Sequence, residues 1–168
     1  MLKKIFFYIA AAGWVLSLVV HFLSIDKYDI TDKIPYIWAL HIFLIVVWLP
    51  AILYLVKDKE FKNMTPSAVF KSIYKKCPFW VITICLICFI YAGINFSIYL
   101  NSYIGSADII DGQYVLQNKG ALIKNISEEE YHEYNAAQTR AFSGHWLVFY
   151  GIAAVILFPS KKQVENDL

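Results

Sequence analysis

Three histidines lie near one end of three apolar segments, and they are the side chains of this chain best suited to chemistry. His21 lies four residues before the end of the first segment, His41 five residues into the second and His145 three residues into the last. Imidazoles on different helices can bind zinc or copper, or hold a haem iron from two sides. The pattern predicts a candidate site for haem b or a transition metal at His21, His41 and His145.

Polar residues on neighbouring segments could support such a site. Asn95 and Tyr99 lie on the polar stripe of a further apolar segment, and Arg140 immediately precedes the one that holds His145. Ionisable groups inside a bilayer are costly and usually face a protein interior. The alternative is that the histidines are structural and bond to Ser, Asn, Tyr and backbone carbonyls. With no local metal motif such as H-E-x-x-H in the sequence, both interpretations stay open, and the structural one is favoured.

The pair Cys85 and Cys88 has the spacing of a redox motif. A four-span chain with a long loop before its last span looks like the quinone-coupled disulfide oxidases, but those enzymes need cysteines in that loop, and residues 101–141 contain none. Cysteines at helical i and i+3 positions in lipid are expected to be small packing residues. The sequence therefore favours a protein that is not an enzyme.

The elements that would position the histidines are membrane spans. Of the 168 residues 59% are hydrophobic, far more than in a soluble domain. A helix needs roughly 20 apolar residues to cross a bilayer. We expect one all-α membrane domain, 1–168, that forms a four-transmembrane-helix bundle with spans at 5–25, 36–56, 79–100 and 142–158.

The basic residues predict the orientation of these spans. Ten of the fifteen Lys and Arg residues fall in the N-terminus, the loop 57–78 and the C-terminal tail, whereas nine of the thirteen acids fall on the opposite side. Basic loops stay on the cytoplasmic side, so both termini are expected in the cytoplasm. The lysines follow this rule and do not indicate nucleic acid binding. Within 57–78, Val69, Phe70, Ile73 and Tyr74 have the spacing of a basic amphipathic helix that could lie on the inner leaflet, or the loop is an ordinary connector.

The segment 101–141 is expected to form an extracytoplasmic insert. Two β-compatible runs flank Asn118-Lys119-Gly120, which predicts a hairpin with a three-residue loop. Ser127 precedes Glu130 by three residues, the arrangement of a capping box at a helix start. The last helix is therefore expected to begin in water and project from the membrane. His132 and the acids of "SEEEYHEY" could bind a cation loosely, but a solvated face is favoured.

The stretches "DGQYVLQNKGALIKNISEEEYHEYNAAQTRAFSGHWLVFYGIAAVILFP" and "PYIWALHIFLIVVWLPAILYL" resemble a group of small uncharacterised bacterial four-span integral membrane proteins. The likeness covers about half of the chain. It implies a bacterial cytoplasmic (inner) membrane location, and it implies no activity.

Two functional hypotheses follow. The first is a non-enzymatic binding, accessory or immunity-type protein, which acts through its outer module on another membrane or extracytoplasmic protein; four-span bacteriocin immunity proteins share this plan. The alternative is a haem- or metal-binding membrane protein that uses the three histidines.

Overall fold

Three helices give the chain its membrane character. The computed structural model describes residues 2–25, 29–31, 33–34, 36–57, 65, 67–68, 71, 73–74 and 77–159. Within this part of the chain, α1 (Leu2–Leu23), α2 (Ala39–Lys57) and α4 (Phe79–Ser102) are long and apolar enough to cross a membrane. These three helices support the membrane class expected from composition. Val69 and Phe70, on which the amphipathic-loop prediction depends, lie outside the described residues.

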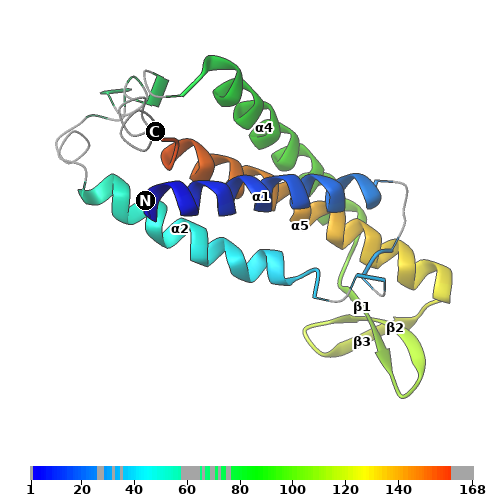
Figure 1. Ribbon diagram of the computed structural model, residues 1–168. Coiled ribbons are helices and arrows are strands. Elements are labelled where there is room, and N and C mark those ends of the chain that lie inside the picture. The colour runs from blue at the N-terminus through cyan, green and yellow to red at the C-terminus, as the bar shows by residue number, and fades with distance from the viewer. Residues whose placement is uncertain are drawn as a thin grey trace.

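A fourth long helix, α5 (Glu128–Ile156), lies at the centre of the arrangement, and α1, α2 and α4 all pack on it (Figure 1). α5 begins as predicted, because the Ser127 hydroxyl accepts a hydrogen bond from the Glu130 backbone N–H and the Glu130 carboxylate accepts one from the Ser127 N–H. α5 is not among the three helices that meet the length and hydropathy requirements of a span. The crossing predicted for 142–158 thus stays a prediction.

Glycines on two helices allow close packing against α5. A Cβ atom added at Gly144 would lie 3.6 Å from Ala92 Cβ of α4. A Cβ atom added at Gly151 would lie 3.1 Å from Cys85 Sγ of the same helix. On the opposite side, Gly13 of α1 accommodates the ring of Tyr150, which is almost fully buried. Small residues of this kind allow helices to approach closely.

The segment between α4 and α5 forms a three-stranded antiparallel sheet, which we call the sheet module (Figure 1). Its strands are β1 (Ser106–Ile110), β2 (Gln113–Asn118) and β3 (Ala121–Asn125), in the order β1-β2-β3. The predicted hairpin corresponds to β2 and β3, but its loop has two residues, since Asn118 pairs with Ala121. The prediction of a hairpin alone was incomplete because β1 adds a second hairpin.

Both hairpin turns have the same backbone conformation. Asp111 and Gly112 have φ of 51° and 77°, and Lys119 and Gly120 have φ of 51° and 84°. Two consecutive residues with positive φ form the two-residue turn whose twist matches that of antiparallel strands. The Asp-Gly pair is a strong signal for this turn, and it was the sequence feature that could have revealed β1.

Candidate functional site

His21 of α1 lies at the centre of a hydrogen-bonded network that joins three helices. Its Nδ1 lies 2.9 Å from the Ser143 hydroxyl of α5, and its Nε2 lies 2.8 Å from the Tyr91 hydroxyl of α4. Because the Ser143 hydroxyl donates to the Arg140 carbonyl, its oxygen is free to accept from Nδ1–H, and Nε2 can then accept from Tyr91. The His21 residue is 3% exposed, and a neutral imidazole satisfies every member of this network.

His41 reaches α5 from α2. Its Nδ1 accepts a hydrogen bond from the indole N–H of Trp146 at 3.0 Å, and the Trp146 residue is completely buried. The Trp146 ring also packs edge-on against Trp38. His41 Nδ1 therefore provides the hydrogen-bond acceptor that the indole N–H of the buried Trp146 needs.

His145 belongs to α5 itself and turns toward α4. Its Nδ1 lies 2.9 Å from the Ala141 carbonyl one turn earlier, and its ring meets Phe96 with centroids 4.5 Å apart. The side chain is half-buried. This hydrogen bond stays within its own helix, so it does not connect α5 to another helix.

The structure therefore places the three predicted histidines at one turn of α5, but their rings make separate contacts. His21 joins α5 to α1 and α4, His41 joins it to α2, and His145 packs on α4. Among the described residues no group of three or more His, Cys, Asp or Glu side chains is arranged to hold a metal ion. What this arrangement does chemically is to satisfy buried polar groups at helix contacts.

Asn95, Tyr99 and Arg140 lie beside this turn. The Asn95 side-chain amide donates to the Arg140 carbonyl at 3.1 Å, which links α4 to α5. The Tyr99 ring stacks on Tyr103 with centroids 5.7 Å apart. The Arg140 Nε and the Thr139 hydroxyl are buried without a hydrogen-bond partner in the described part of the chain.

Tyr91 and Ser143 were not predicted as partners of His21 from the sequence. They lie 70 and 122 residues from His21 along the chain. Spacing within a single helix carries no information on such distant pairs. The signal that was present is the row of Ser17 and His21 on one face of α1, which Ser24 continues just after the end of the helix; all three residues are buried.

A second polar cluster fixes the connection between α1 and α2 onto α5. The Asp29 carboxylate accepts hydrogen bonds from His132 Nδ1 at 2.9 Å and Asn135 at 3.2 Å, and also from the backbone and side chain of Thr31. The Asp29 side chain is only 3% exposed. His132, interpreted from sequence as part of a solvated face, thus holds a buried carboxylate.

Acidification should release this connection. Burial alone would raise the pKa of Asp29, but the hydrogen bonds from His132, Thr31 and Asn135 outweigh burial and lower it below the ordinary 3.8. Because the pKa of Asp29 is lower in the folded protein than in the unfolded chain, the ionised carboxylate stabilises the contact above pH 3.8. This stabilisation is lost as the pH falls through the pKa that Asp29 has in the folded protein. Hydrogen exchange of residues 29–34, corrected for its intrinsic pH dependence, should increase in that range.

The matched variants are Asp29→Asn and Asp108→Asn. The first should weaken the contact at neutral pH by about 1–3 kcal/mol, because hydrogen bonds to a buried charged group are lost. The second removes an exposed sheet carboxylate and should leave exchange at 29–34 unchanged. Equal exchange in wild type and Asp29→Asn at pH 7 would contradict the role of Asp29.

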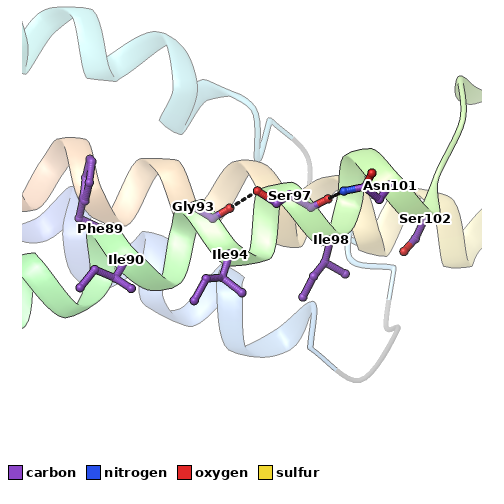
Figure 2. A pocket seen from close by; sticks show the side chains of 8 residues that line it. All are labelled: Phe89, Ile90, Gly93, Ile94, Ser97, Ile98, Asn101 and Ser102. Carbon is purple, nitrogen blue, oxygen red and sulfur yellow. Dashed lines mark hydrogen bonds between the residues drawn. The ribbon is translucent and has the colours of Figure 1, made fainter.

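The outer face of α4 carries a shallow pocket of about 640 Å³ (Figure 2). Three of its residues, Gly93, Ser97 and Asn101, follow one another at helical spacing. The Ser97 hydroxyl donates to the Gly93 carbonyl and the Asn101 amide donates to the Ser97 carbonyl. These donors are satisfied within α4, so the face can lie against lipid.

Comparison of the chain with protein-family models, curated proteins and solved structures gave no match.

Proposed function

We propose that this chain is a multi-pass protein of a bacterial cytoplasmic membrane whose sheet module binds another protein, in an accessory or immunity-type role without catalysis. The observation that carries the proposal is the apolar surface of the module. Ile104, Ile109, Ile110, Leu122 and Ile123 are 45–67% exposed. Consecutive strand residues point to opposite faces, so both faces of the sheet carry exposed aliphatic side chains, and apolar exposure on a small module is typical of interaction sites.

The outer strand of the module supports the same proposal. β3 is an edge strand, and all five of its residues are exposed. An exposed sheet edge can pair with an extended segment of a partner through its backbone groups, while apolar side chains beside it provide contact area. A partner segment that adds to β3 would cover Leu122 and Ile123 as it pairs.

The proposal includes a fourth span formed by α5. The buried residues of α5 include Thr139, Ser143, Trp146 and Tyr150, which lie against other helices. A helix enclosed by α1, α2 and α4 need not be as apolar as a helix that faces lipid, because its neighbours shield its polar groups. This enclosure explains how 142–158 can cross with lower hydropathy than the other three.

We place the N- and C-termini in the cytoplasm and the sheet module outside it. The support is the distribution of lysines, ten of which lie at the N-terminus, between α2 and α4, and after α5. With this orientation, the expected partner is an extracytoplasmic protein or the extracytoplasmic part of another membrane protein.

In-cell photocrosslinking tests the function. A photoreactive amino acid at Leu122 should give an adduct with one specific protein, whereas the same group at Lys119, an exposed polar turn residue, should give little. Adding Ile123→Asp to the Leu122 probe should remove the adduct, because a charge is placed in the apolar contact. Adducts with lipid alone, or equal protein adducts from both positions, would contradict the proposal.

A further inference from the structure

An apolar pocket of about 280 Å³ lies between α1, α4 and the end of α5, away from the histidines and the sheet module. Phe7 and Trp14 of α1 form one wall, Trp80 and Cys85 of α4 form another, and Gly151 and Phe158 contribute from α5 and its C-terminal extension. In Figure 1, α1 and α4 diverge toward the ends that carry Leu2 and Phe79. The pocket therefore lies where the two helices separate.

Two features give the pocket its shape. The rings of Phe7 and Phe158 meet edge-on with centroids 5.5 Å apart, which brings the α1 and α5 walls into contact. At Gly151 an added Cβ would lie 3.1 Å from Cys85 Sγ and 3.4 Å from the Trp14 ring, so the glycine fits closely between these two walls. A volume of about 280 Å³ is smaller than that of one turn of a helix about 10 Å wide, so the pocket does not hold a helix.

We propose that this pocket binds one acyl chain of a phospholipid from the leaflet that surrounds the N-terminus of α1. A methylene group is similar in size to a water molecule, which occupies about 30 Å³, so the pocket holds on the order of ten methylenes. An acyl chain is apolar in bilayer and pocket alike. Dispersion contacts with the aromatic walls, and not release of water, must therefore favour the pocket.

A basic residue that precedes the pocket residues on α1 favours a phospholipid as the source of the chain. Lys4 lies seven residues before Ala11, which lines the pocket, and one turn before Phe7 on the same face of α1. Seven residues of helix span about 10 Å, the distance that separates a headgroup from the upper acyl chain. The Lys4 ammonium can thus attract an anionic phosphate while the chain enters between α1 and α4.

The test uses the full chain in nanodiscs that contain phosphatidylglycerol with a photoreactive group near the middle of one acyl chain. After irradiation, adducts at Trp14 and Cys85 should be prominent in wild type. Ala11→Phe fills the pocket and should reduce these adducts at least about fivefold. The matched variant Ala12→Phe adds the same ring to the exposed face of α1 and should leave them unchanged.

Two further labelling experiments test whether a phospholipid is the source of the acyl chain. A photoreactive free fatty acid should label Trp14 and Cys85 less than the phospholipid, and Lys4→Gln should reduce labelling by phosphatidylglycerol. If Ala11→Phe does not fold, native mass spectrometry of the wild type decides, and one retained phospholipid per chain is expected. Equal labelling of Ala11→Phe and Ala12→Phe, stronger labelling by the fatty acid, or no retained phospholipid would overturn the proposal.

Discussion

Replacing Gly13 with alanine should destabilise the protein by about 2–3 kcal/mol, because overpacking of a tight contact forces rings and backbone to move. The added Cβ would overlap Tyr150 Cε1 and would lie 2.6 Å from Tyr150 Cδ1, far inside van der Waals contact. The ring has little freedom to yield, since the Tyr150 residue is 1% exposed and its hydroxyl donates to the Leu40 carbonyl at 2.7 Å. A lowered melting temperature in detergent would report the loss.

Gly93→Ala is the matched control for this substitution. Gly93 also lies within a helix, but among the described residues no heavy atom beyond its chain neighbours and the nearby backbone of α4 lies within 4 Å of the site where its Cβ would be. Alanine is a better helix former, so this variant should be neutral or more stable by about 0.5–1 kcal/mol. Equal melting temperatures for Gly13→Ala and Gly93→Ala would show that the contact between α1 and Tyr150 is absent.

His21→Leu should cost about 3 kcal/mol, because it removes two interhelical hydrogen bonds and leaves the Tyr91 hydroxyl and a buried Ser143 oxygen without their partner. His41→Phe should cost about 1–3 kcal/mol, since the buried Trp146 N–H loses its acceptor. His145→Leu should cost less than either, because its hydrogen bond lies within one helix. Thermal unfolding of the three purified variants measures this order.

A cofactor would produce a different pattern. If His21, His41 and His145 held haem or a metal, purified wild type would show a Soret band or stoichiometric metal, and substitution of any two ligands would remove it. The observed contacts favour the structural order given above, in which the three losses are unequal. Comparable losses for all three histidines, together with a bound cofactor, would overturn the structural interpretation.

Apolar length predicted α1, α2 and α4 from the sequence because a span depends on local composition alone. The start of α5 was equally local, since the capping box of Ser127 and Glu130 lies within four residues. β1 was not predicted, although Asp111-Gly112 is a strong signal for the turn that joins it to β2.

The contacts of the three histidines were harder to predict, because they depend on how each helix is rotated about its axis. Helix spacing predicts the depth of His21, His41 and His145 in a membrane. The direction in which each ring points depends instead on the rotation of its helix about its own axis, relative to the neighbouring helices. That rotation is set by packing, such as Ala92 against Gly144 and Tyr150 against Gly13. The pairing of Asp29 with His132, 103 residues apart, likewise depends on the docked position of two segments.

The fourth crossing by α5 is the central claim, and the side of the membrane on which each end of α5 lies tests it most directly. In a variant without native cysteines, Lys119→Cys probes the sheet module and a cysteine added after Leu168 probes the C-terminus. A membrane-impermeant maleimide should label the first in intact spheroplasts and the second only after permeabilisation. Labelling of both in intact spheroplasts would show that α5 does not cross, and labelling of the C-terminal cysteine alone would show that the orientation is reversed.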